Sequence, residues 1–204
     1  MNHLAHALLA GEDELMQLGG MLGDFVHGPP EALRLPEGAI DGVRLHRAID
    51  VYTDSHPEVV AARALFEPPY RRYAGILLDM WFDHCLARDF LRWSGQPLHL
   101  FSPALRDLLY RHESLLPPDL KRFLVYMETH GLPAGYADPA EIGIALAGIS
   151  RRLRRANPLA QSLPVLEALR VPLQQRFEVF FPQLQRFARE WRTGHRPSTG
   201  MHRS

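Results

Sequence analysis

The spacing of apolar residues favours helices along the whole chain. Leu, Ala, Arg and Glu dominate, Val, Ile and Thr are sparse, and strict alternation of apolar and polar residues never persists long enough for a sheet. The pattern therefore predicts an all-α fold, a single helical bundle. The expected helices cover about residues 2–9, 14–25, 39–53, 58–65, 73–93, 102–112, 117–130, 139–156 and 161–192.

Proline and glycine mark the expected boundaries between these helices. Gly28-Pro29-Pro30 ends the second helix, and Pro68-Pro69 ends the fourth. Residues 73–93 form the most apolar segment, so we expect this helix to lie at the centre of the bundle. The sequence indicates one domain over residues 1–193, followed by a disordered tail over residues 194–204.

Composition narrows the class of protein. The single cysteine, Cys85, excludes a disulfide framework, and we expect it to be a core residue. No apolar run approaches the roughly 20 residues that span a bilayer, and the N-terminus lacks the positive charge of a signal peptide. These features predict a cytoplasmic protein that binds no membrane.

The net charge of zero conceals two opposed parts. Residues 1–149 hold 12 basic and 20 acidic side chains, whereas residues 150–204 hold 11 arginines and three glutamates. The first part therefore carries a net charge of −8 and the second a net charge of +8. The basic part offers a docking surface for an acidic partner, and its densest run is Arg151, Arg152, Arg154 and Arg155.

Histidine and aspartate concentrate near the N-terminus, where residues 1–84 hold six of the eleven histidines. His46 and Asp50 are four residues apart, so they share one helix face, which is either a solvated ridge or a platform for a divalent metal. Asp79 and Asp83 repeat this spacing in the most apolar helix. Burial of ionised carboxylates there costs several kcal/mol unless they are paired or bind a metal.

Two further candidates lie singly among apolar residues. Asp24 is either a ligand or an acid on the exposed edge of its helix, and His6 is either a ligand or a hydrogen-bonded core histidine. Asn2 and His3 lie too near the terminus to be ranked. Imidazoles mixed with carboxylates, without a thiolate cluster, favour Mn²⁺, Mg²⁺ or Fe²⁺ over a structural zinc site.

Five sequence blocks, taken in order, resemble one bacterial family. They read Met-Asn-x-Leu-Ala-His at residues 1–6, Gly-Asp-Phe-Val-x-Gly at 23–28, His-Arg-x-Ile-Asp-Val-x-Thr-Asp at 46–54, Leu-Asp-x-x-x-Asp-His at 78–84 and Ser-Arg-Arg at 150–152. The chain resembles the acyl carrier protein phosphodiesterases from residue 1 to about residue 190. The blocks are specific in combination, although each alone is a weak signal.

The resemblance implies a divergent member of the HD phosphatase and phosphodiesterase superfamily. Such an enzyme removes 4′-phosphopantetheine from the serine of holo-acyl carrier protein with Mn²⁺ or a similar cation. The implied metal ligands are Asp24, His46, Asp50, Asp83 and His84, with His6 and Asp79 as lesser candidates. The order Asp83-His84 reverses the usual His-Asp pair, so the ligand assignment of that superfamily does not transfer directly.

The expected chemistry is hydrolysis of a phosphodiester. A bound divalent cation lowers the pKa of its water and acts as a Lewis acid, while Asp79 or Asp50 would orient or deprotonate that water. Arg47 is either a clamp on the phosphate or a surface arginine. Two other classes stay open: a non-catalytic helical module that binds an acidic protein, and a nucleic-acid binder. The second is disfavoured because no aromatic residues are interleaved with the arginine run.

Overall fold

The computed structural model describes residues 1–194, and these residues are helical with no strand, which confirms the all-α prediction. The α-helices are α1 (His3–Leu9), α2 (Glu14–Leu22), α3 (Glu37–Ser55), α4 (Pro57–Ala64), α5 (Ala74–Arg88), α6 (Phe90–Ser94), α7 (Leu98–Arg111), α8 (Pro118–Thr129), α9 (Pro139–Arg152), α10 (Leu163–Ala168) and α11 (Arg170–Gly194). Short 3-10 helices lie at Pro30–Ala32 (η1), Tyr70–Tyr73 (η2), Glu113–Leu115 (η3), Ala134–Ala137 (η4) and Leu159–Gln161 (η5).

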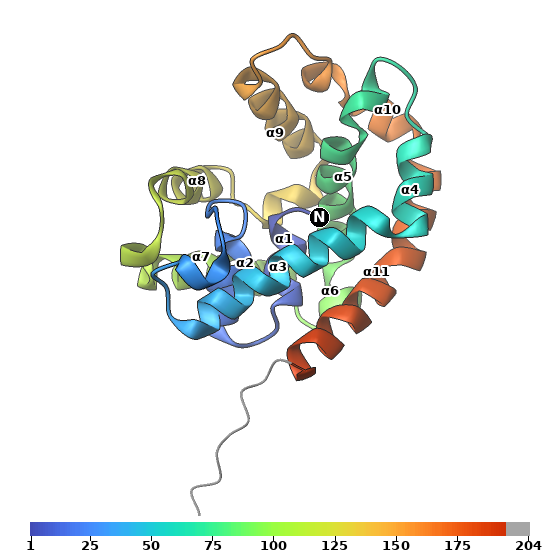
Figure 1. Cartoon of the computed structure of the whole chain (residues 1–204). Coiled ribbons are helices and arrows are strands. Elements are labelled where there is room, and N and C mark those ends of the chain that lie inside the picture. Colours follow the sequence, from blue (N-terminus) through green and yellow to red (C-terminus); the bar gives the residue numbers. More distant parts are fainter. Residues whose placement is uncertain (195–204) are drawn as a thin grey trace, which may run out of the picture.

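Helix α5 is the central element, as its apolar sequence predicts. It contacts α1, α4, α9 and α11, and Figure 1 shows it between the α3–α11 side and the α8–α9 side of the molecule. Trp81, Phe82 and Cys85 on this helix are each about 1% exposed. Burial of such large side chains contributes about 1.5–3 kcal/mol each, so α5 is a rigid base for the elements around it.

Helices α2 and α3 pack against each other more closely than side chains would permit. A Cβ atom at Gly19 would lie 2.6 Å from the Cα atom of Gly42 and 2.1 Å from the carbonyl oxygen of Ala39. The Asp13 side chain caps α2 by accepting a hydrogen bond from the Met16 N–H at 2.9 Å. This close approach fixes α3 against the C-terminal end of α2.

Several expected boundaries were wrong. Helix α2 ends at Leu22, and the expected helix over residues 73–93 is interrupted at Asp89, whose φ of −113° and ψ of 28° leave the helical region. Helix α7 begins at Leu98 and continues through Pro103. The expected helix over residues 161–192 is divided into α10 and α11, and Pro182 lies inside α11.

Helix α9 ends at Arg152, earlier than the expected residue 156, so Arg154 and Arg155 follow the helix. Helix α11 continues to Gly194, and the rest of the expected tail, residues 195–204, lies outside the described residues. None of the described helices combines the length and the apolar character that crossing a membrane requires.

Candidate metal centre and adjoining cavity

Four side chains from three neighbouring segments converge beside the amino group of Met1, which lies 3.7 Å from Asp50 Oδ1. The His46 Nε2 atom lies 3.3 Å from Asp50 Oδ2 and 3.4 Å from Asp24 Oδ1, and the His6 Nε2 atom lies 3.2 Å from Asp50 Oδ1. The rings of His6 and His46 stack with their centroids 3.6 Å apart. We call these four residues the His/Asp cluster.

Local backbone features hold the ring of His46 in place. His46 and Asp50 are one turn apart on α3, so both side chains reach the same side. The His46 Nδ1 atom donates a hydrogen bond to the Gly20 carbonyl oxygen at 2.8 Å, which leaves Nε2 facing the carboxylates. Gly23 makes room for the ring, because a Cβ atom there would lie 2.2 Å from the His46 Cγ atom.

The electrostatics of the cluster favour a cation between its two carboxylates. Burial opposes the charged form of His46, but hydrogen bonds and attraction to Asp24 and Asp50 raise its pKa to about 9. Burial also works against ionisation of the two carboxyls, yet their hydrogen bonds to His46 hold both pKa values well below the usual range. Without a metal, the His46 proton therefore supplies the positive charge at this position.

His6 differs from His46 because it stays neutral. Burial, followed by the charge of nearby His46, lowers the pKa of His6 to about 3. Its Nε2 atom lies 3.2 Å from the Met1 carbonyl oxygen as well as from Asp50 Oδ1, whereas its Nδ1 atom is buried and has no hydrogen-bond partner. A neutral imidazole with a free lone pair is the form that binds metals.

The donor set fits a divalent metal. One ligand atom from each of His6, His46 and Asp50 lies within 4.8 Å of the others, and no other group of three among residues 1–194 has this spacing. Imidazole with carboxylate suits Mn²⁺, Fe²⁺ and Zn²⁺ alike, so the donor chemistry supports a cation without identifying it. Asp24 faces the same His46 nitrogen as Asp50 and could supply a fourth ligand.

Asp79 lies at the edge of the His/Asp cluster. Its Oδ1 atom is 3.1 Å from the amino nitrogen of Met1, which in turn lies 3.7 Å from Asp50 Oδ1. The Asp79 side chain is 42% exposed, so it remains accessible to water. The structure thus brings Asp79 near the cluster through this shared ion pair.

The adjacent pair Asp83 and His84 points elsewhere. Asp83 is completely buried and accepts hydrogen bonds from the backbone N–H groups of Leu4 at 2.8 Å and Ala5 at 3.2 Å. Burial raises the pKa of this carboxyl to about 7 in spite of those bonds. Asp83 therefore holds the first turn of α1, the helix that carries His6.

His84 and Arg47 also lie apart from the cluster. The His84 Nδ1 atom donates a hydrogen bond to the Tyr136 carbonyl oxygen at 2.9 Å, and the ring lines a separate cavity of about 360 Å³ beside Arg88. Arg47 donates a hydrogen bond to the Gly28 carbonyl oxygen at 2.8 Å and so fastens the loop after α2. In the structure, the four expected sites Asp24, His46, Asp50 and His6 are together, and His84 and Arg47 are not.

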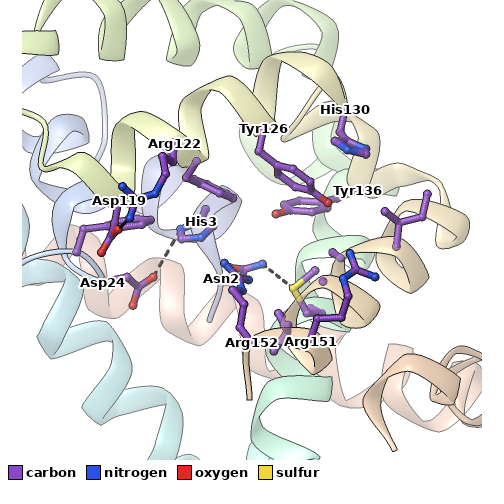
Figure 2. A pocket seen from close by; sticks show the side chains of 17 residues that line it. Asn2, His3, Asp24, Asp119, Arg122, Tyr126, His130, Tyr136, Arg151 and Arg152 are labelled. Carbon is purple, nitrogen blue, oxygen red and sulfur yellow. Dashed lines mark hydrogen bonds and ion pairs between the residues drawn. The ribbon is translucent and has the colours of Figure 1, made fainter. Parts of the chain in front are cut away.

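A cavity of about 890 Å³ adjoins the His/Asp cluster, and Asp24 belongs to both. Figure 2 shows His3 beside Asp24 at one end of this cavity, with Tyr126, Tyr136 and His130 at the other. The His3 Nδ1 atom lies 3.5 Å from Asp24 Oδ2, and burial lowers the pKa of His3 to about 4. Sequence reasoning left His3 unranked, although its i, i+3 spacing from His6 places both on one side of α1.

The remaining walls of the cavity come from α8 and α9. The four arginines are all exposed, but only Arg151 and Arg152 line the cavity, and Arg154 and Arg155 do not. The four expected docking arginines are therefore divided between the cavity and the surface beyond α9.

Comparisons with known proteins agree on one family. Residues 1–184 match the family model described as acyl carrier protein phosphodiesterase. A protein of that name from Serratia proteamaculans is 35% identical over 191 residues, which cover 93% of this chain and 98% of the relative. A relative from Escherichia coli O6:H1 is 36% identical over 188 residues, which cover 90% of this chain and 95% of the relative. A relative from Photorhabdus laumondii is 34% identical over 188 residues, which cover 90% of this chain and 93% of the relative.

No solved structure matches the chain, so its kinship with the HD superfamily stays a prediction. The family model and the relatives instead span nearly the whole of the described chain, including the His/Asp cluster and the cavity beside it. This chain belongs to the acyl carrier protein phosphodiesterase family.

Proposed function

We propose that this protein hydrolyses the phosphodiester that joins 4′-phosphopantetheine to the serine of holo-acyl carrier protein, giving the apo form. The observation that carries the proposal is the convergence of His6, His46, Asp50 and Asp24 next to a cavity that shares Asp24. The name shared by the family model and the relatives supplies the substrate class. The expected cytoplasmic location and single domain over residues 1–193 stay predictions.

The proposed cofactor is a divalent cation, with Mn²⁺ as the first choice. His6, His46 and Asp50 would hold it, and Asp24 would complete the set. When bound, such a cation provides Lewis acidity and makes water a stronger nucleophile. Its ligands lie on α1, α3 and the turn after α2, an arrangement typical of sites inside helical bundles.

The carboxylates would position the attacking water. The two carboxylates are equally exposed, at 41% for Asp50 and 42% for Asp79, but Asp50 is turned toward both imidazoles of the cluster, whereas Asp79 lies at its edge and faces no imidazole. Asp79 is therefore better placed than Asp50 to accept a proton from water and pass it to solvent. The role expected for Arg47 as a phosphate clamp would require its side chain to leave the Gly28 carbonyl oxygen.

The proposed docking surface for the carrier is the end of α9 and the residues that follow it. Arg151, Arg152, Arg154 and Arg155 lie there, within the basic part of the sequence. A positive surface at the mouth of the cavity would attract an acidic carrier and orient its serine toward the cluster. Nucleic acid and membranes are not expected partners.

The test is mass spectrometry of holo-acyl carrier protein after incubation with the protein and Mn²⁺. We expect the carrier to lose the phosphopantetheine mass. His46→Gln should lose this turnover and the Mn²⁺ affinity together, whereas His99→Gln, an exposed histidine on α7, should retain both. An unchanged carrier with each of Mn²⁺, Mg²⁺ and Fe²⁺ would instead favour the non-catalytic module for an acidic protein.

A further inference from the structure

The cavity beside the His/Asp cluster carries positive charge that the protein itself does not neutralise. Arg151 and Arg152 line it, and neither has a carboxylate partner within 4 Å among residues 1–194. Arg122 also lines the cavity but is paired with Asp119. Two unpaired guanidinium groups facing one cavity provide the donors that recognise a phosphate ester.

A continuous row of rings follows one wall of the cavity. The ring centroids of His3 and Phe123 are 4.5 Å apart, those of Phe123 and Tyr126 are 6.1 Å apart, and those of Tyr126 and His130 are 4.2 Å apart. The row begins beside Asp24 and ends on the far side of the cavity (Figure 2). Such a wall suits a long, narrow and largely uncharged chain.

The opposite wall is the apolar face of α9. Ile144, Ala145, Gly148 and Ile149 line it, and Gly148 carries no side chain to fill the space. A Cβ atom at Gly148 would meet only the Arg151 guanidinium, at 3.8 Å. The volume of about 890 Å³ lies within the range of pockets that enclose a small-molecule ligand.

We propose that this cavity binds the 4′-phosphopantetheine arm itself, independently of the carrier protein. The phosphate lies at the Asp24 and His3 end, in the cavity that Arg152 also lines (Figure 2). The uncharged amide chain and its thiol extend between the ring row and α9. This inference rests on the proposed function for the identity of the ligand, and it assigns α8 and α9 to recognition of the arm.

The test is calorimetric titration of free 4′-phosphopantetheine into the Mn²⁺-loaded protein. Gly148→Trp fills the cavity and should weaken binding about tenfold or more. The matched control Val125→Trp adds the same ring to the exposed side of α8, where Val125 is 61% exposed, and should leave the affinity unchanged.

Two arginine variants, one inside and one outside the cavity, test the orientation of the arm. Arg152→Gln should weaken the binding of phosphopantetheine about tenfold and leave the binding of dephosphorylated pantetheine unchanged. Arg186→Gln, at an exposed arginine on α11 outside the cavity, should alter neither affinity. Equal affinity of Gly148→Trp and Val125→Trp for the arm would overturn the proposal. Failure of the wild type to bind the free arm at millimolar concentration would also overturn it.

If the protein does not hydrolyse holo-acyl carrier protein, the experiments give a different pattern of results. The carrier would then keep its arm in the mass-spectrometric assay, but the calorimetric comparison of the variants would still report whether the cavity binds phosphopantetheine. Conversely, rapid removal of the arm by Gly148→Trp with wild-type KM would refute the assignment of the cavity while leaving the hydrolase assignment intact.

Discussion

Asp83 offers a direct test of whether the buried carboxylate of α5 is a metal ligand or a structural cap. It is completely buried and accepts the backbone N–H groups of Leu4 and Ala5 at 2.8 and 3.2 Å. Replacement by Ala leaves both amide groups buried without a partner, at about 1–3 kcal/mol each. We therefore expect Asp83→Ala to lose about 2–6 kcal/mol, a large share of the roughly 5–15 kcal/mol that stabilises a typical domain.

Asp83→Asn serves as the matched variant because it resembles the protonated acid. Burial raises the pKa of Asp83 to about 7 from the ordinary value of 3.8 for an aspartate. The protonated carboxyl of Asp83 therefore favours the folded state. This contribution to stability is complete below pH 3.8 and is lost as pH rises through about 7. At about 1.4 kcal/mol per pKa unit, that loss is on the order of 4 kcal/mol. Asp83→Asn keeps one acceptor oxygen, but its NH2 group cannot accept the second backbone N–H, so it should be about 1–3 kcal/mol less stable than the wild type near pH 4. Toward pH 8 the wild type loses its protonated carboxyl, so Asp83→Asn should become the more stable of the two.

The assay is urea unfolding of the metal-free proteins between pH 4 and pH 8, followed by Mn²⁺ titration of the folded variants. We expect Asp83→Asn to bind Mn²⁺ within about twofold of the wild type, because Asp83 bonds to α1 and not to the cluster. Loss of Mn²⁺ binding by a stably folded Asp83→Asn protein would refute this reasoning and restore Asp83 as a ligand. So would equal stability of the Asn and Ala variants.

Three further outcomes are expected. Gly42→Ala should destabilise the protein by about 1–3 kcal/mol in thermal unfolding, because its Cβ atom would lie 2.4 Å from the Met16 carbonyl oxygen. The control Gly75→Ala should not destabilise the protein, because the nearest atom to its Cβ would be 3.9 Å away. The apparent Mn²⁺ affinity measured by calorimetry should rise with pH up to about 9, because the metal must displace the proton of His46, whose pKa is about 9. An affinity that stays constant from pH 6.5 to 9 would contradict this expectation. His84→Gln should retain Mn²⁺ binding in the same titration, since the ring lines a separate cavity, and a loss of binding would contradict that placement.

Much of the architecture follows from local sequence. Apolar spacing predicts the helices and their order, because helix formation depends on residues three or four positions apart. The same local rule pairs His46 with Asp50 on one face of α3. Helix ends were predicted less well, since the break at Asp89 and the division between α10 and α11 depend on packing that no local pattern records.

The tertiary structure decided which of the candidate acids and histidines act together. In sequence, Asp79 and Asp83 look equivalent on one helix, yet Asp79 reaches the His/Asp cluster through the Met1 amino group, whereas Asp83 binds the backbone of α1. His3 acquires its place only because α1 lies between Asp24 and α8. Side-chain type and periodicity are local properties, so the sequence alone determined the helices and the candidate ligands. Burial, charge and partners arise from contacts between distant segments, and these exist only once the helices have packed.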